Sequence, residues 1–525
     1  MNRLKLAVAV LASVCATAAF ANEHGRAEVS GAVKQDTLHS LRDVVVNQAD
    51  FKKMRERAEH DIPLPHVPDN QTDGAVQSFG ATYAPTFGNS VDGVGKGFTG
   101  PQGSFTVQYA PPDTVGAIGA TQYVQVVNTG MAIFDKATKS VVYGPVPTSA
   151  LWAGFGGGCE SNNDGDATVN YDRAAGRWVI EQFSVSTTPY LQCVAVSKTS
   201  DATGAYNRYA FSYGTTQFPD YPKVGVWPDG YYTTYNIFNN GSTFGGAKLC
   251  AFDRAAMLAG NPATQQCFQL STSYGGVLPS DLDGSTAPPA GSPNYMVNFG
   301  SNSLNLWKFH VDWANTANTT LSGPTNIPVA AFTAACSGGT CIPQSGTHNQ
   351  LDSLADRLMF RLAYRNFTGH ESLVVSQSVK VGTTRKDAHT GVRWYELRSP
   401  GTTPVVYQQS SYSPDTNYRW MPSVAMDKQG NMALGYSVSS ATMFPAARYT
   451  GRLATDALNT MQSETSIVEG TGAQTGTLHR WGDYSALTVD PADDCTFWYT
   501  TEYLKANGTW NWSTRVGSFK FAGCQ

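Results

Sequence analysis

Aspartate residues recur along the chain at intervals that could bring them together in a folded repeat. The mean step between these recurring positions is about 60 residues. Several carry an arginine, an aromatic residue or a second acid close by in sequence. Arginines and acids can bind the carboxylate and hydroxyls of a sugar, and paired carboxyl groups can supply the acid and base that cleave a glycosidic bond. The positions are Asp113, Asp166, Asp220, Asp283, Asp356, Pro422, which carries no acid, and Asp483.

These residues give two sets of predicted site residues. The predicted catalytic residues, with acid–base or metal roles for the aspartates, are Asp166, Asp220, Asp356, Asp483 and Tyr484. The predicted substrate-binding residues are Arg357, Arg419, Arg480 and Trp481. For any single aspartate the alternative is a structural hydrogen bond to the backbone of a neighbouring repeat.

A short acidic segment has the alternating oxygen ligands of a calcium loop. Asn162, Asp164 and Asp166 stand at alternate positions, but the twelfth position is Arg173, where an EF-hand needs a bidentate glutamate. The pattern therefore excludes an EF-hand and predicts another kind of calcium site, with Asp164 and Asp166 as ligands.

The elements that must position these residues are β-strands. The 525 residues are 41% hydrophobic and 11% aromatic, with 51 glycines and only 14% charged residues, against about 25% in average domains. Short runs rich in Val, Ile, Thr, Tyr and Phe alternate with Gly, Pro, Asn and Asp from about residue 105 onward. This composition excludes a disordered chain, a collagen and a coiled coil. The clearest helix in this region is predicted near Asp253.

The recurring positions predict a repeat architecture for residues 105–525. Each aspartate or proline precedes an alternating strand, a turn and a second strand, and the period accommodates four strands with their loops. We therefore predict an all-β fold, a β-propeller that most simply has seven blades, with the recurring residues around its central channel. The alternative is two successive β-sandwiches, which would show similar short strands.

The N-terminal part of the chain differs from the rest. Residues 1–21 predict a signal peptide, with Arg3 and Lys5 before an apolar run and Ala19-Phe-Ala21 as the cleavage site; the alternative is a membrane anchor. Sixteen of residues 22–70 are charged, and helical spacing occurs around His39 and Phe51. Residues 22–104 are thus a charged, partly helical arm and linker. The arm is either a solvated extension or a pro-segment or docking helix that covers part of the main domain.

The cysteines and the charge indicate the compartment and the partners. Without Cys15 eight cysteines remain, and neighbours in sequence predict the disulfides Cys159–Cys193, Cys250–Cys267, Cys336–Cys341 and Cys495–Cys524. A secreted or periplasmic protein is expected. Cleavage leaves 34 basic and 40 acidic residues, which argues against a nucleic-acid partner. No later segment is apolar enough to span a membrane, so the expected partner is an extracellular carbohydrate or a cell-surface protein.

Two motifs carry a resemblance to known proteins. The hairpin Asp427-Lys-Gln-Gly-Asn431 and the segment Ser413-Pro-Asp-Thr-Asn-Tyr-Arg-Trp420 are similar to blade hairpins and an Asp-box of sialidase-like propellers. The run Arg480-Trp-Gly-Asp-Tyr-Ser485 resembles a group of uncharacterised secreted bacterial proteins. The resemblance implies propeller architecture.

Sialidase chemistry would need three arginines and a Tyr–Glu pair, and Tyr484 with Glu502 or Glu371 could make that pair. The candidate arginines are Arg357, Arg419, Arg448 and Arg480. The Phe/Tyr-Arg-Ile-Pro motif of sialidases is absent.

These observations lead to one functional hypothesis and one alternative. We expect a secreted propeller that binds an extracellular, acidic glycan at its central channel and that, if it is an enzyme, acts as a glycoside hydrolase or a polysaccharide lyase. The alternative is a non-catalytic adhesion or protein-binding scaffold.

Overall fold

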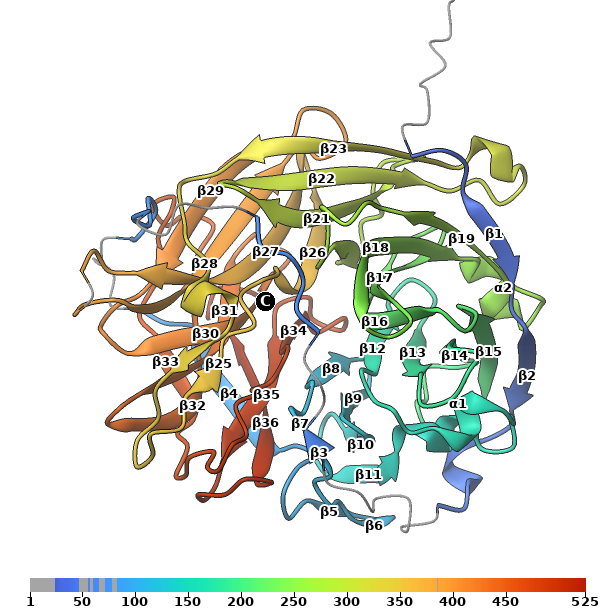
Figure 1. Ribbon diagram of the computed structural model, residues 1–525, viewed down its shortest axis with the longest axis horizontal. Helices are drawn as coiled ribbons and strands as arrows, with labels where there is room; N and C mark the ends of the chain where they lie inside the picture. Colours follow the sequence, from blue (N-terminus) through green and yellow to red (C-terminus); the bar gives the residue numbers. More distant parts are fainter. Residues whose placement is uncertain (1–23, 47–54, 57–59, 66–70, 78–82, 385) are drawn as a thin grey trace, which may run out of the picture.

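The protein is an arrangement of antiparallel sheets around a central axis (Figure 1). The structure is a computed structural model that describes residues 24–46, 55–56, 60–65, 71–77, 83–384 and 386–525. The predicted signal peptide, residues 1–21, lies outside the described residues.

The first three sheets follow one another in chain order. The first sheet contains β8 (Val115–Ile118), β9 (Gln122–Val127), β10 (Gly130–Asp135) and β11 (Val141–Pro147). The second contains β12 (Thr168–Asp172), β13 (Arg177–Ser184), β14 (Leu191–Ser197) and β15 (Tyr206–Ser212). The third contains β16 (Gln217–Val226), β17 (Tyr231–Asn239), β18 (Thr243–Phe252) and β19 (Thr264–Gln269).

The later strands repeat the same up-and-down order. The fourth group is β20 (Leu278–Asp283), β21 (Asn294–Gly300), β22 (Ser303–His310) and β23 (Thr320–Pro328), and the fifth is β26 (Met359–Phe367), β27 (His370–Val381), β28 (His389–Arg398) and β29 (Val405–Tyr412). The sixth is β30 (Tyr418–Met426), β31 (Met432–Ser440), β32 (Met443–Arg452) and β33 (Thr465–Val468). The last contains β34 (Ala486–Val489), β35 (Phe497–Leu504) and β36 (Trp512–Lys520).

The first strands of these groups form a closed ring. Each of β8, β12, β16, β20, β26, β30 and β34 contacts the next, and β34 contacts β8. β20 and β26 pair in parallel, from Ser280 opposite Leu362 to Asp283 opposite Arg365, so the fourth and fifth groups share one eight-stranded sheet. The predicted all-β, propeller-type fold is therefore confirmed. The number of seven blades stays a prediction, which the order of the first strands supports.

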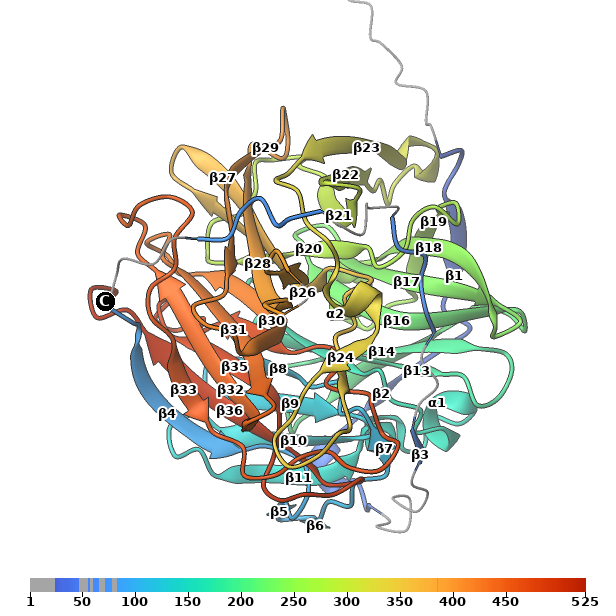
Figure 2. The same cartoon turned by 60° about the vertical axis from the view of Figure 1, so that its left-hand side comes forward.

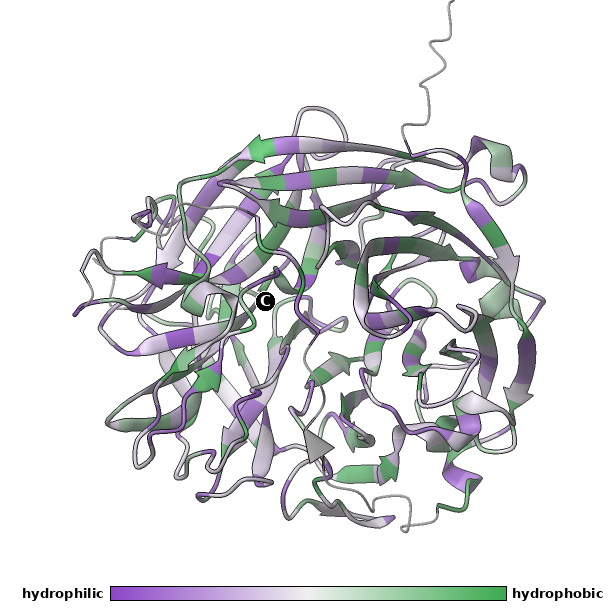
Figure 3. Cartoon of the chain, viewed as in Figure 1, coloured by the Kyte–Doolittle hydropathy of each residue, from purple (hydrophilic) through white to green (hydrophobic). Residues whose placement is uncertain are grey.

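The strands are buried on both faces because neighbouring sheets pack against each other. Figure 3 shows apolar and polar residues interspersed along them. Every residue of β14 is buried, and β17 is buried except for Asn239. A strand with both faces covered carries apolar residues on both sides, which is why the sequence shows short continuous β-rich runs.

The N-terminal arm adds strands to the edges of this ring. β1 (Glu28–Gly31) pairs with β19, and β2 (Lys34–Leu38) pairs with β15, each as a fifth strand. β4 (Thr86–Asp92) pairs with β36 and completes the last sheet, as Figure 2 shows beside the C-terminus. β4, which precedes β8 in the chain, is thus paired with the last strand, β36.

The helical character expected for this arm is mostly absent from its described residues. The segment after His39 forms only a short 3-10 helix, Leu41–Asp43, and Arg55–Glu56 forms β3, which pairs in parallel with β7 (Tyr109–Ala110). Helical spacing in a short charged segment is outweighed here by the free edges of the sheets, which offer backbone hydrogen bonds. Residues 47–54 lie outside the described residues.

The other short elements lie in loops. The helix predicted near Asp253 is α2 (Arg254–Ala259), whose first turn is capped by the Asp253 side chain at 2.9 Å from the Ala256 backbone nitrogen. The others are α1 (Gly158–Ser161), the 3-10 helices Thr148–Trp152, Thr316–Asn318 and Ala335–Gly338, and the strands β5 (Thr99–Gly100), β6 (Gly103–Ser104), β24 (Thr340–Ile342) and β25 (Leu351–Asp352). No helix in the described part of the chain is both long enough and apolar enough to cross a membrane.

Four disulfides connect the eight cysteines of the described residues. They are Cys159–Cys193, Cys250–Cys267, Cys336–Cys341 and Cys495–Cys524, the pairing of sequence neighbours that the spacing predicts. Disulfides of this number fit an extracellular or periplasmic compartment.

Candidate functional site at one mouth of the channel

The chain makes the same unusual turn where it enters most of the first strands. The turn residue has a positive φ, a conformation that costs free energy for most residues and is tolerated best by glycine, asparagine and aspartate. These residues and their φ angles are Asp113 (48°), Asp166 (46°), Tyr221 (56°), Gly276 (57°), Leu354 (42°), Met421 (51°) and Asp483 (54°). At Tyr221 and Met421 the turn is a bulge inside the strand.

Three of these turns place buried carboxyl groups next to one another. Asp483, Asp113 and Asp166 precede β34, β8 and β12, which are consecutive around the ring. Their residues are only 7%, 2% and 7% exposed. Burial, together with the charges of Asp483 and Asp166, raises the pKa of Asp113 well above its ordinary value. Asp113 therefore holds its proton to a higher pH than an exposed aspartate does.

Asp483 differs from Asp113 in its protonation. Burial raises its pKa to about 6, with Asp166 adding to the shift, while Arg480 and Arg357 oppose it. The Arg480 guanidinium forms an ion pair with this carboxylate. The ion pair with Arg480 therefore favours the ionised form of Asp483, whereas burial favours the protonated form of Asp113, and such a difference allows one acid and one base in the same site.

A lysine that the sequence analysis did not select lies in the middle of this group. Lys223 is fully buried, with its ammonium nitrogen 3.5 Å from the ring centre of Tyr221 and 3.8 Å from that of Tyr484. Burial lowers its pKa to about 8, although the charges of Asp166 and Asp113 act in the opposite direction. A lysine within an otherwise apolar strand, Tyr221-Pro-Lys-Val-Gly-Val226, was the signal that could have identified it.

The two tyrosines complete the wall around Lys223. Their ring centres are 5.6 Å apart, and the Tyr484 hydroxyl donates to Asp113 Oδ2 at 3.4 Å. The Tyr221 hydroxyl donates to the backbone oxygen of Asp483, also at 3.4 Å. Burial raises the pKa of both hydroxyl groups, so both remain protonated donors.

On the next part of the mouth, acids and cations form pairs. Arg357 donates to both oxygens of Asp356 at 2.6 and 2.9 Å, and its guanidinium lies 4.5 Å from the ring centre of Tyr221. Asp220 accepts from the His60 ring nitrogen at 3.1 Å. The mouth therefore combines five acids with three cations and a histidine.

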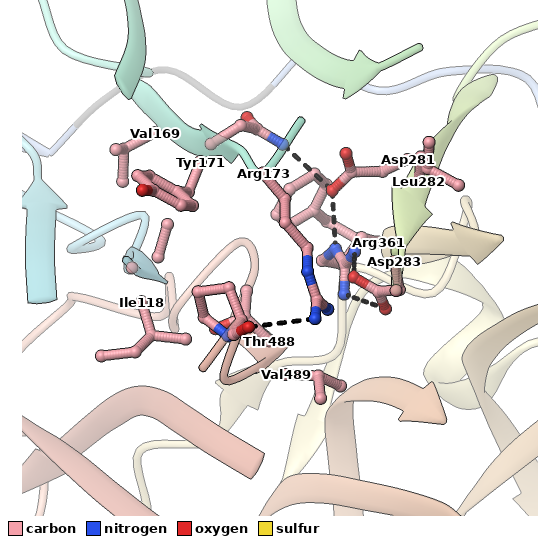
Figure 4. A pocket seen from close by; sticks show the side chains of 16 residues that line it. Ile118, Val169, Tyr171, Arg173, Asp281, Leu282, Asp283, Arg361, Thr488 and Val489 are labelled. Atoms are coloured by element: carbon pink, nitrogen blue, oxygen red, sulfur yellow. Dashed lines mark hydrogen bonds and ion pairs between the residues drawn. The ribbon is translucent and has the colours of Figure 1, made fainter. Parts of the chain in front are cut away.

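A separate ion-pair cluster lines a small pocket near the ends of β8, β12 and β20 (Figure 4). Arg361 pairs there with Asp281 at 2.9 Å and with Asp283 at 2.6 Å, beside a cavity of about 40 Å³. Asp283, one of the recurring positions in the sequence, is thus at the end of β20 and not at its beginning. The turn of that repeat is Gly276, seven residues earlier than the acid that marked it.

The structure brings most, but not all, of the predicted residues together at this mouth. The residues that lie there are Asp166, Asp220, Asp356, Asp483, Tyr484, Arg357 and Arg480. Arg419, at the start of β30, instead pairs with Asp415 at 2.8 Å and with Glu464, which precedes β33, at 2.9 Å. Trp481 packs between two sheets against Trp420 and donates to Ser437 Oγ at 3.1 Å.

The predicted metal ligands make other contacts. Asp164 accepts hydrogen bonds from the backbone nitrogens of Val185 and Ser186 at 2.7 and 2.8 Å, which fixes the loop after β13. Within the described ranges no group of three or more His, Cys, Asp or Glu side chains is arranged to hold a metal ion. Calcium at Asp164 and Asp166 stays a prediction.

Glu502, one of the two glutamates suggested as a partner of Tyr484, is fully buried and accepts from the Gly482 backbone nitrogen at 2.8 Å. Burial raises the pKa of Glu502 well above its ordinary value. It therefore supports the turn that holds Asp483.

No protein-family model matches the chain, and no curated protein matches it. The sialidase-like resemblance therefore stays a prediction beyond the propeller architecture.

Among solved structures, the WD40 domain of SCAP from fission yeast matches with a TM-score of 0.33 and 8% identity, over 77% of this chain and 82% of that chain. An ulvan lyase of polysaccharide lyase family PL25 matches with a TM-score of 0.28 and 12% identity, over 81% of each chain. The polysaccharide lyase Uly1 matches with a TM-score of 0.27 and 8% identity, over 83% of this chain and 99% of that chain. These likenesses are distant, and none of them assigns an activity to this chain.

Proposed function

We propose that the protein binds an extracellular glycan at the channel mouth of Asp113, Asp166 and Asp483 and cleaves a glycosidic bond there. The observation that carries this proposal is the different surroundings of neighbouring buried carboxyl groups. Burial raises the pKa of Asp113 well above its ordinary value, whereas Asp483, with a pKa of about 6, pairs with Arg480 and is mostly ionised at neutral pH. Glycoside hydrolysis needs one protonated and one ionised carboxyl group on the two sides of the bond.

The two carboxyl groups then have different roles. Asp113 donates its proton to the glycosidic oxygen as the bond to the anomeric carbon breaks. Asp483 accepts a proton from the water whose oxygen attacks that carbon, so the proton given up by one acid is balanced by the proton taken by the other. Lys223, as an ammonium ion between Tyr221 and Tyr484, stabilises the negative charge of the site.

The remaining groups suit the hydroxyls of a sugar. Arg357 and Asp356 form a pair that offers donors and an acceptor side by side, and Tyr221 and Tyr484 supply ring faces and hydroxyl donors. A uronic acid would compete with Asp356 for the Arg357 guanidinium. Neutral and acidic polysaccharides must therefore both be tested as substrates.

The test is turnover of a panel of neutral and acidic polysaccharides by the purified protein. New reducing ends without ultraviolet absorbance indicate hydrolysis, whereas an unsaturated, absorbing product indicates a lyase. Removing an acid–base group costs about 100-fold or more, so Asp113→Asn and Asp483→Asn should each abolish most of the activity. The matched control is Asp387→Asn, an exposed aspartate on a distant loop, which should retain it.

Three results would contradict the proposal. Activity that survives both substitutions would remove the assigned residues, and an absorbing product would replace hydrolysis with elimination. Retention on a glycan array without turnover would leave a carbohydrate-binding protein and overturn the cleavage step.

A non-catalytic protein-binding role is the second candidate, and one observation favours it. The mouth already contacts a peptide backbone, because Asp356 Oδ2 accepts from the Ile62 nitrogen at 3.1 Å. Retention of a cell-surface protein by the wild type and equally by Asp113→Asn and Asp483→Asn, with no glycan bound, would support this role.

A further inference from the structure

One segment of the N-terminal arm lies across the channel mouth. Before it, β3 pairs with β7 close to the Asp113 turn; after it, the Gly74 backbone nitrogen donates to the Ala331 oxygen at 2.8 Å. Gln77 then exchanges hydrogen bonds with the Met461 backbone at 2.8 and 2.9 Å. Residues 60–65 therefore cross from the first sheet toward the fifth and sixth, and Figure 1 shows this dark-blue segment over the centre of the ring.

The segment is anchored first by His60. Its ring nitrogen is 3.1 Å from Asp220 Oδ2, and the ring lies 4.6 Å from the Phe238 ring and 5.3 Å from the Phe218 ring, measured between centres. The His60 backbone oxygen accepts from Arg357 Nη2 at 3.4 Å. His60 also lies within the electrostatic influence of Asp166 and Arg480. The same acids and arginines form the proposed glycan site.

The second anchor is Ile62, which is only 5% exposed. Its backbone nitrogen donates to Asp356 Oδ2 at 3.1 Å, and its side chain packs against Gly275 and Gly276. A Cβ atom built on Gly275 would lie 3.2 Å from the Ile62 Cβ and 2.9 Å from Phe244 Cζ, so a side chain at that position fits only if these neighbours shift. Glycine at this turn leaves the room that Ile62 fills.

The sequence of the segment reduces the conformational entropy that the segment loses when it docks. Residues 60–65 read His-Asp-Ile-Pro-Leu-Pro, and the two prolines restrict the unbound chain before it docks. The segment thus has the properties of a bound ligand: two backbone hydrogen bonds, an ion pair, a buried apolar side chain and low conformational freedom.

We infer that residues 60–65 are a built-in occupant of the channel mouth, which closes the site and must leave before any other ligand enters. The consequence for a glycan substrate rests on the proposed function, whereas the occupancy does not. The segment supplies a histidine to Asp220 and a backbone donor to Asp356, so it uses the groups that a sugar would otherwise bind. A released form of the protein is then the one that takes the external ligand.

A disulfide designed between positions 62 and 275 would hold the segment of residues 60–65 in the mouth. The double variant Ile62→Cys with Gly275→Cys places two Cβ atoms 3.2 Å apart, slightly closer than in disulfides, so the bond needs a shift of a few tenths of an ångström and a small movement of the Phe244 ring. Gly275 does not have a positive φ, so its backbone accepts a cysteine. We expect this bond to form on oxidation of the full chain, as detected by mass spectrometry of a digest. The single variants Ile62→Cys and Gly275→Cys are the controls.

The opposite variant should release the segment. Ile62→Asp places a charge in the apolar contact with Gly275 and Gly276 and removes the burial of a large side chain, which shifts such an equilibrium about tenfold or more. The ligand-free readout is acylation of Lys223, the buried amine at the mouth, by a small water-soluble reagent. We expect faster acylation than in the wild type for Ile62→Asp, slower acylation for the locked double variant, and no change for His348→Ala, an exposed histidine elsewhere.

The outcomes separate the occupancy from the function. Lys223 acylation that is equal in the wild-type and Ile62→Asp proteins, or that the oxidised double variant does not slow, would overturn the inference. If acylation follows the expected order but the Ile62→Asp protein retains no glycan, the occupancy is supported and the proposed function fails. Glycan retention that is equal in the locked and released forms would overturn the claim that the segment excludes the ligand.

Discussion

At the scale of single residues, one amino-acid type serves both the backbone and the chemistry of the mouth. Aspartate tolerates the positive φ that the turns at Asp113, Asp166 and Asp483 require, and it brings a carboxyl group to the same place. The sequence was therefore a good guide to these acids, because the turn and the charge recur together. It was a poor guide to Lys223, whose role depends on two tyrosines that are distant from each other in sequence.

The protonation states predict a bell-shaped pH dependence of kcat/KM. Activity should fall below about pH 6, where Asp483 takes up a proton and can no longer act as the base. It should fall again above about pH 8, where Lys223 loses its charge. The measurement is the pH profile of hydrolysis for the wild type and for Lys223→Met. Persistence of the alkaline limb in Lys223→Met would contradict the assignment of that limb.

Arg419 should behave as a structural residue. Its side chain is fully buried and pairs with Glu464 at 2.9 Å, so Arg419→Met leaves a mostly buried carboxylate without its main partner. We expect the free energy of unfolding to fall by about 3–5 kcal/mol in urea denaturation. Arg42→Met, which breaks an exposed pair with Asp201, should cost about 1 kcal/mol or less. Equal costs would show that the Arg419 pair contributes no more than a surface pair.

At the scale of elements, strands could be predicted from the sequence better than their boundaries and their partners. The helix after Asp253 and the hairpin turn of Asp427, which accepts from the Gln429 and Asn431 nitrogens at 2.8 and 3.0 Å, were both readable from local residues. The role of Thr86–Asp92 was not, because a strand that pairs with β36 more than 400 residues later has no local signal. Local residues were also misleading for the fourth repeat: Asp283 was expected to precede its first strand, but it lies at the end of β20.

The strand β4 should contribute more to stability than the other arm strands. Val91→Pro interrupts its pairing with Val516 and exposes the edge of β36, so we expect a loss of about 2–3 kcal/mol and a tendency to aggregate. Val29→Pro affects β1, a fifth strand outside the ring, and should cost less. Urea denaturation and light scattering of both variants provide the comparison. An equal effect of the two prolines would mean that β4 is not needed to close the ring.

At the scale of the whole molecule, the ring collects groups that no local pattern connects. The ring of first strands could be predicted from the repeat. The position of residues 60–65 over the mouth was covered only by one of the two alternatives for the arm, a segment that covers part of the main domain. Its docking depends on Asp220, Asp356 and Arg357, which the fold assembles from different sheets.

The occupancy of the mouth should depend on pH through His60. The hydrogen bond to Asp220 raises the pKa of His60 above 6.5, and the charges of Asp220 and Asp166 add to this, while burial and Arg480 oppose it. Because the docked pKa is the higher one, protonation holds the segment in place, and this contribution is lost as the pH rises through the raised pKa. The other charged groups next to this segment are Asp61, Asp356 and Arg357.

Hydrogen exchange of the Ile62 amide, which donates to Asp356, measures this release. Exchange, corrected for its intrinsic pH dependence, should accelerate above the raised pKa in the wild type and show no such step in His60→Gln. The exposed-histidine variant His348→Ala serves as the control and should keep the step. A step that persists in His60→Gln would assign the pH dependence to another group.

The pairing of β4 with β36 also determines when the fold can be completed during synthesis of the chain. A nascent chain that has emerged only as far as the sixth sheet contains Asp113, Asp166 and Lys223, but it lacks Asp483 and cannot join its early strand to a late one. Completion of the fold and completion of the proposed acid–base pair are consequently a single event. Premature termination upstream of β34 would yield a product whose ring is not closed and which lacks one member of the proposed pair.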